Sequence, residues 1–302
     1  MIDDRYVHHT RLHNKSIFLK ITPHARLEII LGLEHWVQWG GTSSRYGKQP
    51  SSFKDYLRIV CGKAGGDGAT NSDIINALGN HLGREHLRIN YKGDNYLLSF
   101  YHDIPFEDGS GTDFRSFPDG VYAFYFGSKE KKRWLSDIIY EFNYTKYQSG
   151  RYHNPPGHPE QVLGGNDNYF NNGEYQSGWT LYGRTIGSPL MTPHEPNAKG
   201  ITLGIYNNRI IGHHIGLKGQ AWKKIPYKIM LTYTLNYGQY VKPLPQAPQK
   251  QFSFALEAAL PQTPKLPLRI DVGIYGDRGE FLPNNLGFTL KLSRKDIIKR
   301  KK

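Results

Sequence analysis

The stretch RLEIILGLEHWVQW, residues 26–39, decides the fold class because apolar residues recur at nearly every second position along it. One face carries Leu27, Ile29, Leu31, Leu33, Val37 and Trp39, and the other carries Arg26, Glu28, Gly32, Glu34 and Gln38. A period of two residues predicts a β-strand that is apolar on one side. Fourteen such residues are long for a soluble strand and suit a tilted strand that crosses a membrane.

The same alternation returns along the chain. It is clear at 135–147, where Ile138, Tyr140, Phe142 and Tyr144 share a face, and again from Lys228 to Tyr237. Shorter strands are predicted at 86–92, 95–103, 120–126, 208–217, 251–260, 268–275 and 285–293, with weaker ones at 15–21 and 175–184. Tight turns at Lys92–Asn95, Lys218-Gly219 and Asp277-Arg278-Gly279 would join several of them into hairpins. The chain thus holds roughly a dozen strands of about 10 residues each.

Composition supports an all-β architecture. The chain has 21 Tyr, 14 Phe and 33 Gly, which favours strands and turns. It contains no run of about 18 apolar residues, which excludes a helical membrane protein. We therefore predict an antiparallel transmembrane β-barrel as a single domain over 1–293, followed by a basic tail at 294–302. The rival interpretation is a soluble β-sandwich lectin, in which the apolar faces would form the core.

Several segments depart from the strand pattern. Helices are predicted at 51–61 and 71–80 from the spacing of their apolar residues, and such helices would lie in a loop or plug the barrel lumen. Long irregular segments at 104–118, 148–178 and 187–207 are predicted as extracellular loops, because barrels keep their periplasmic turns short. The N-terminal residues 1–6 lack a secretory signal, so an exported protein with this sequence would be a mature chain, a fragment or the product of a misplaced gene start.

A search for catalytic chemistry finds no convincing motif. The glycine-rich stretches at 41–47 and 62–68 lack the Lys-Ser or Lys-Thr of a phosphate-binding loop. In each of the histidine pairs His8-His9 and His213-His214, the two side chains would point to opposite faces of a strand and could not bind one metal ion together. Cys61 is the only cysteine, so no cysteine pair supports a metal site. We therefore predict no enzyme activity, catalytic residue, cofactor or metal site. A hydrolase remains the alternative if lumen carboxylates pair around a cleft; the candidates are Asp137, Glu141, Glu257 and Asp271.

The segment from Gly164 to Thr185 interleaves amides, carboxylates and aromatic rings. Carbohydrate recognition uses planar polar groups for hydroxyls and ring faces for the apolar sides of sugars. We predict a polysaccharide-binding site formed by Asn166, Asp167, Asn168, Tyr169, Asn171, Trp179 and Arg184. The formal charge of +13 suits anionic lipid headgroups, an acidic polysaccharide or nucleic acid equally well.

Several landmarks of the sequence resemble the Wzi-like capsule-assembly family of outer-membrane proteins, in its Bacteroidetes form. The resemblance covers about residues 25–293. It is carried by residues 32–41, 76–83, 137–150, the Asn/Gly-rich segment, 183–189 and 208–214.

The resemblance implies an 18-stranded, non-enzymatic barrel in the outer membrane of a Gram-negative bacterium that binds capsular polysaccharide and helps attach it. Members of the family are usually longer at the N-terminus. The absence of those strands implies a barrel that is incomplete unless other strands close it. The implied partners are surface polysaccharide, outer-membrane lipid and capsule export proteins, and not nucleic acid. A diffusion porin is the rival function on the same barrel.

Overall fold

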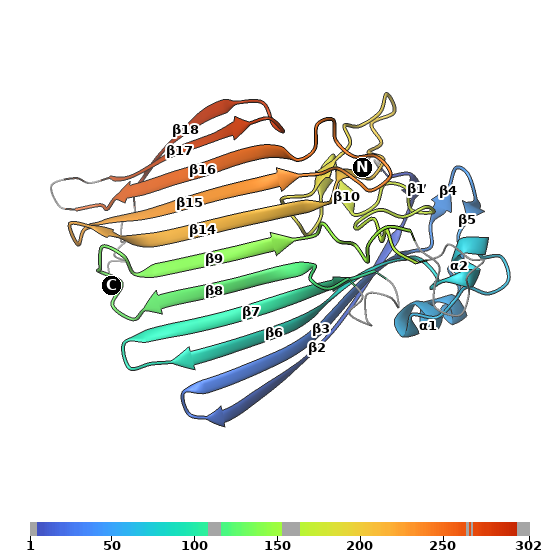
Figure 1. Ribbon diagram of the computed structural model, residues 1–302, viewed down its shortest axis with the longest axis horizontal. Helices are drawn as coiled ribbons and strands as arrows, with labels where there is room; N and C mark the ends of the chain where they lie inside the picture. Colours follow the sequence, from blue (N-terminus) through green and yellow to red (C-terminus); the bar gives the residue numbers. More distant parts are fainter. Residues whose placement is uncertain (1–4, 108–115, 153–163, 264–265, 267, 295–302) are drawn as a thin grey trace, which may run out of the picture.

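The computed structural model describes residues 5–107, 116–152, 164–263, 266 and 268–294. Its long strands are β2 (Arg11–His24), β3 (Leu27–Trp39), β6 (Asn80–Lys92), β7 (Tyr96–Phe106), β8 (Gly120–Ser128), β9 (Asp137–Tyr144), β14 (Ile210–Ala221), β15 (Ile225–Asn236), β16 (Gln249–Leu260), β17 (Arg269–Gly279) and β18 (Asn285–Ser293). They form one antiparallel sheet in the order β18-β17-β16-β15-β14-β9-β8-β7-β6-β3-β2 (Figure 1). The predicted all-β, antiparallel fold is confirmed.

The shorter elements all lie between the long strands or before them. They are β1 (Val7–His8), β4 (Thr42–Ser43), β5 (Gly47–Lys48), α1 (Phe53–Cys61), α2 (Asn71–Ile75), β10 (Thr180–Leu181), β11 (Arg184–Thr185), β12 (Thr192–Pro193) and β13 (Ile205–Asn207). The single strand predicted at 175–184 was wrong, since only the two-residue β10 and the first residue of β11 lie there. The turns predicted at Lys218-Gly219 and at 277–279 were also wrong, because β14 and β17 continue through them.

The register gives the large sheet a polar face and an apolar face. Residues directly opposite each other in neighbouring strands point the same way. Glu34 pairs with Arg84, His86 with Asp103, and Glu141 with His214, so these side chains share the polar face. On the other side Ile215 lies between Tyr140 and Leu231. The two-residue alternation predicted from the sequence therefore extends across the whole sheet.

The apolar face is uncovered over most of its area. We call it the apolar belt and define it by its exposed members: Ile17, Leu19, Leu31, Leu33, Phe100, Phe124, Tyr140, Ile215, Tyr233, Phe252, Leu256, Ile274, Phe288, Leu290 and Leu292. Ile17 is 70% exposed and Leu290 is 69% exposed. Glu85, the cross-strand partner of Leu33, also lies on this face and is a charged residue among the apolar ones. No second sheet of the described chain packs against the belt, which contradicts a soluble sandwich.

The connections differ between the two ends of the sheet. At one end the strands are joined through 40–79, 107–119, 145–209, 237–248 and 280–284. At the other end the connections are 25–26, 93–95, 129–136, 222–224 and 261–268. The long segments therefore gather at one end, on the right in Figure 1. We call this the long-loop end and the opposite one the short-turn end.

Helix α1 packs on the apolar side of the sheet, at the long-loop end. Val37 and Trp39 lie on the same strand face as the belt, and they form a buried cluster with Ile59 of α1 and with Leu78. Lys15 of β2 also donates to the Val60 carbonyl. Of the two placements predicted for the helices, a loop or the barrel lumen, α1 takes the first: it lies in the β3–β6 connection and packs Ile59 against the end of the apolar face.

The polar side is instead covered by part of the segment 145–209. Phe170, Trp179 and Met191 form a buried cluster with Ile205 and Ile210, against which Trp36 and Leu82 of the sheet pack. Trp36 points to the polar side because it alternates with Val37. The loop segment thus has its own small core, which anchors it over the sheet.

Candidate functional site

A polar cleft opens at the long-loop end, between the region of α2 and the Asn/Gly-rich segment. Its volume is about 530 Å³. We call it the asparagine cleft, because amides and carboxylates dominate its lining: Asp73, Asn76, Asn80, Glu107, Asn166, Asp167, Asn168, Asn171 and Asn172, with Tyr152 beside them. Planar polar groups at this density can hydrogen-bond many hydroxyls of one ligand.

Asp119 fixes the segment that forms one wall of the cleft. Its carboxylate accepts hydrogen bonds from the backbone N–H of Tyr147 at 2.9 Å and of Gln148 at 2.6 Å, and from the Tyr169 hydroxyl at 2.9 Å. The residue is fully buried. Burial raises the pKa of the Asp119 carboxyl to about 6, although its three donors oppose that shift.

Two asparagines tie the cleft wall to the start of β14. Asn208 donates to the Asn168 side chain at 2.9 Å and to the Tyr169 carbonyl at 2.7 Å. Asn171 donates to Asn168 at 3.0 Å and accepts from the Ile205 N–H at 2.7 Å. Asn166 and Asn168 also adopt positive φ angles, which asparagine tolerates better than most residues. The high asparagine content therefore serves the loop structure as well as the cleft surface.

Asp73 supports the opposite wall. Its Oδ1 accepts from the Gly79 N–H at 3.2 Å, while the Thr70 side chain caps the start of α2. Its Oδ2 is buried without a hydrogen-bond partner among the described residues. Burial raises the pKa of the Asp73 carboxyl to about 6, and the nearby Glu174 charge adds to the shift. Its ionised form is therefore disfavoured in the folded protein.

Four of the seven predicted binding residues line the cleft, namely Asn166, Asp167, Asn168 and Asn171. Tyr169 and Trp179 do not offer their rings to a ligand, because they are only 1% and 2% exposed and belong to the buried cluster of the loop segment. Their predicted stacking role is corrected to a packing role. Local composition cannot separate a buried ring from an exposed one in such a segment.

Arg184 lies away from the cleft, on the β10–β11 hairpin opposite Leu181. Tyr152 is the aromatic residue that the sequence prediction missed, and it lines the cleft with 57% of its surface exposed. Its exposed ring is available for stacking against the apolar face of a sugar. No local pattern around Tyr152 identified it in advance, since it follows the long strand 137–144 in an irregular stretch.

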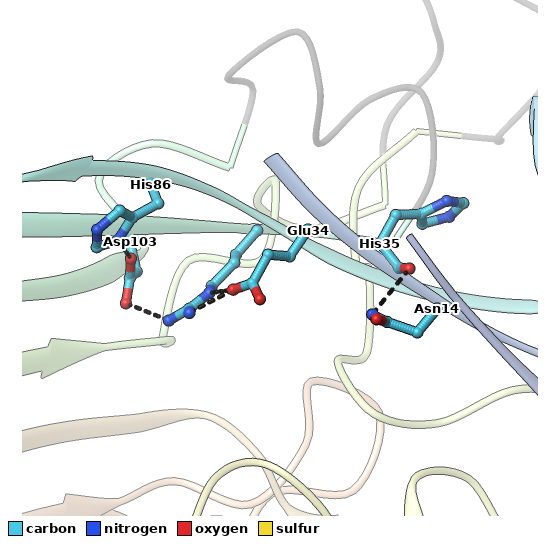
Figure 2. Close-up of polar contacts among 6 residues, drawn as sticks. Asn14, Glu34, His35, His86 and Asp103 are labelled. Carbon is cyan, nitrogen blue, oxygen red and sulfur yellow. Dashed lines mark hydrogen bonds and ion pairs between the residues drawn. The ribbon is translucent and has the colours of Figure 1, made fainter. Parts of the chain in front are cut away.

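The polar face of the sheet carries a network of paired charges. Asp103 accepts from His86 at 2.5 Å and from Arg84 at 2.8 Å, and Arg84 also pairs with Glu34 (Figure 2). Asn14 donates to the His35 carbonyl nearby at 3.5 Å. Charged side chains that are paired in this way are typical of the water-facing interior of a barrel.

The four carboxylates considered for hydrolysis each have a local partner. Asp137 pairs with Lys131 at 2.7 Å, Glu257 with Lys228 at 2.8 Å, and Asp271 with Arg269 at 2.6 Å. Glu141 accepts a hydrogen bond from Tyr101. Among the described residues, no group of three or more His, Cys, Asp or Glu side chains is arranged to hold a metal ion.

The sheet and its loops define the class as an all-β protein of the β-barrel type, with short helices in its loops. No helix within the described ranges has the length and apolarity needed to cross a membrane. No protein-family model matches the sequence, and no characterised protein sequence matches it.

Among solved structures, the chain is similar to Wzi of Escherichia coli, an outer-membrane protein involved in group 1 capsule assembly that is described as a carbohydrate-binding β-barrel. The identity is 14% and the TM-score is 0.49. The match covers 93% of this chain and 50% of the Wzi chain, so this chain spans about half the length of that structure.

Proposed function

We propose that this chain belongs to an outer-membrane β-barrel that binds surface polysaccharide at the asparagine cleft and aids capsule assembly or attachment, without catalysing a reaction. The observation that carries the membrane location is the uncovered apolar belt, which crosses the sheet opposite a charged face. Soluble monomers rarely expose apolar patches beyond a few hundred Å². Hydrocarbon tails of a bilayer are the solvent that suits such a face.

The cleft supports the glycan part of the proposal. Its amides and carboxylates lie at the long-loop end, which faces the outside in bacterial barrels. Tyr152 adds an exposed ring to their hydroxyl-binding groups. The capsule role itself rests on the sequence landmarks that resemble the Wzi-like family. Lipid contacts with the belt belong to the same proposal, whereas contacts with export proteins have no site assigned to them.

The test is direct binding of purified capsular polysaccharide to the protein in detergent. Asn76 and Tyr152 line the cleft, and within the described residues the side chain of neither forms a hydrogen bond that holds the loops. The double variant Asn76→Ala/Tyr152→Ala should weaken binding by about 2 kcal/mol, or roughly thirtyfold, through lost stacking and hydrogen bonding.

The matched control is Tyr182→Ala/Arg184→Ala on the β10–β11 hairpin. Tyr182 is 56% exposed, close to the 57% of Tyr152, but it lies outside the cleft. Binding by this control should equal that of the parent protein. Equal binding by both double variants and the parent would refute the assignment of the cleft.

A diffusion porin is the second candidate, and one observation bears on it. A cavity of about 600 Å³ lies between the polar face and the loop residues 187–190, lined by Arg84, Asp103 and Glu141 among others. The overlying loop narrows access to that face. We therefore expect low conductance of the purified protein in planar bilayers, whereas stable open-pore currents would favour the porin.

A further inference from the structure

Two groups of cations in this protein differ in their partners. On the polar face several cations are neutralised: Arg84 pairs with Glu34 and Asp103, Lys92 with Glu28, and Lys228 with Glu257. A second group lies at the long-loop end, around the ends of β9 and β14–β17, and consists of Lys146, Arg209, Lys242, Lys250 and Arg278. No carboxylate in the described part of the chain forms an ion pair with any of these five residues. We call this second group the rim cations.

The register places two of the rim cations, Lys250 and Arg278, directly above the apolar belt. Lys250 is the cross-strand partner of Leu235, and Arg278 is the partner of Phe252. Both therefore point to the apolar side of the sheet, one step toward the loops from the belt. Arg209 immediately precedes β14, and Lys242 lies in the loop between β15 and β16. The group thus follows the upper margin of β14–β17, at the right-hand end of those strands in Figure 1.

Aromatic rings hold two of these cations in place. The Arg209 guanidinium lies 3.5 Å from the centre of the Tyr240 ring, and its Nε donates to the Lys146 carbonyl at 3.0 Å. The Lys146 ammonium lies 4.5 Å from the centre of the Tyr237 ring. Stacking on a ring orders a cation without neutralising it. The two positive groups are therefore positioned and still able to bind an anion.

We propose that the rim cations bind the phosphate groups of lipid A, the phosphorylated glycolipid of the outer leaflet. The inference rests on the proposed outer-membrane location, which puts the long-loop end at the outer leaflet. A lipid A molecule would place its acyl chains against the belt and its phosphates one step higher, at the level of Lys250 and Arg278. Arginine and lysine are the usual partners of phosphate. The carboxylate of Glu280 also lies in this region, where it accepts a hydrogen bond from the backbone N–H of Lys250.

The position of the group distinguishes lipid from capsule as the source of the anion. Lys250 and Arg278 point to the lipid-facing side of β16 and β17, whereas the asparagine cleft lies beside α2 and the start of β6. An anion held at the rim would therefore belong to a molecule that also touches the belt. That requirement is met by a phosphorylated acyl lipid and not by a free polysaccharide chain.

The experiment compares native mass spectra of the purified full chain with added diphosphoryl lipid A and with chemically dephosphorylated lipid A. The parent protein should retain the diphosphoryl form preferentially. The variant Lys242→Gln/Lys250→Gln/Arg278→Gln removes three exposed cations whose side chains form no hydrogen bond within the described chain. It should lower retention of diphosphoryl lipid A about tenfold and leave retention of the dephosphorylated form unchanged.

The matched control removes three cations at the short-turn end, as Lys132→Gln/Arg133→Gln/Lys223→Gln, and should behave like the parent. Equal losses in the two triple variants, or no preference of the parent for phosphate, would overturn the proposal. Loss of polysaccharide binding by the rim variant, with lipid A retention unchanged, would overturn it in favour of an acidic glycan. Failure of the parent to enter membranes would be seen separately, as protein that does not fold into lipid vesicles, and would refute the proposed function itself.

Discussion

Tyr169 is held from two sides, by the buried cluster around its ring and by Asp119 at its hydroxyl. We expect Tyr169→Ala to destabilise the loop segment by about 3–5 kcal/mol, because it leaves a cavity in a small core. Tyr169→Phe keeps the ring and should cost about 1 kcal/mol for the lost hydrogen bond. Limited proteolysis of residues 164–207 measures both effects. A Tyr169→Ala protein that loses glycan binding at unchanged protease resistance would restore the ring as a direct ligand contact.

Asp73, which lines the cleft, makes the stability of the folded protein depend on pH. Its pKa is raised from 3.8 to about 6 in the folded protein, so the ionised carboxylate costs stability above pH 6 and this cost disappears below pH 3.8. Asp73→Asn keeps an oxygen for the Gly79 N–H and cannot ionise. The variant should be more stable than the parent at pH 8, by up to about 3 kcal/mol, and equally stable at pH 3.5. Thermal unfolding followed by tryptophan fluorescence at the two pH values tests this, and an equal difference at both would contradict it.

The sequence located the candidate site but not the roles of its residues. The Asn/Gly-rich composition drew attention to 164–185, and four of its predicted residues do line one cleft. Asn168 and Asn171 are largely occupied in holding the loop, and Tyr152 and Asp73 come from other parts of the chain. A cleft assembled from distant segments depends on long-range packing, which residue spacing does not report.

At the scale of elements, the sequence predicts strands well and turns poorly. A strand with one apolar face carries an apolar residue at every second position. This alternation over 26–39 and 228–237 located β3 and β15. The turn predicted at Lys218-Gly219 failed because the pairing of Lys218 with Lys228 continues the ladder to Ala221. A glycine inside a strand looks like a turn signal in the sequence, although its role can be to let a neighbouring group approach closely. Gly219 is such a residue, because the Trp134 carbonyl lies close to it.

Helix α1 was predicted to start near Ser51, and its cap is Ser52. The Ser52 hydroxyl accepts from the Asp55 N–H, while the Asp55 carboxylate accepts from the Ser52 N–H. We expect Ser52→Ala to destabilise α1 by about 1 kcal/mol and to speed hydrogen exchange over residues 53–61. Ser51→Ala is the matched control, since the Ser51 side chain takes no part in the cap, and it should leave exchange unchanged. Similar rates in both variants would contradict the capping role.

At the scale of the whole molecule, strand direction constrains how the sheet can close. β2 runs away from the long-loop end, since Arg11 pairs with Trp39 at the end of β3. β18 also runs away from that end, because Asn285 pairs with Asp277 and Ser293 with Arg269. Direct pairing of these two edges would be parallel. A barrel that stays antiparallel throughout therefore needs an odd number of further strands between them, from whatever source, since an open edge in lipid leaves backbone groups unpaired.

The membrane location depends on which side of the sheet meets hydrocarbon, and two adjacent residues of β15 test it. Leu231 lies on the apolar side between Ile215 and Phe254, and Met230 lies on the polar side between Gly216 and Ala255. Leu231→Lys places a charge in the belt and should cost about 2–4 kcal/mol of folding in a bilayer. Met230→Lys places the same charge on the wet side and should be nearly neutral. The fraction that folds into lipid vesicles, read by heat-modifiable gel migration, measures both. Equal damage from the two substitutions would mean that both faces are buried in protein, and a lipid-facing belt would then have to be abandoned.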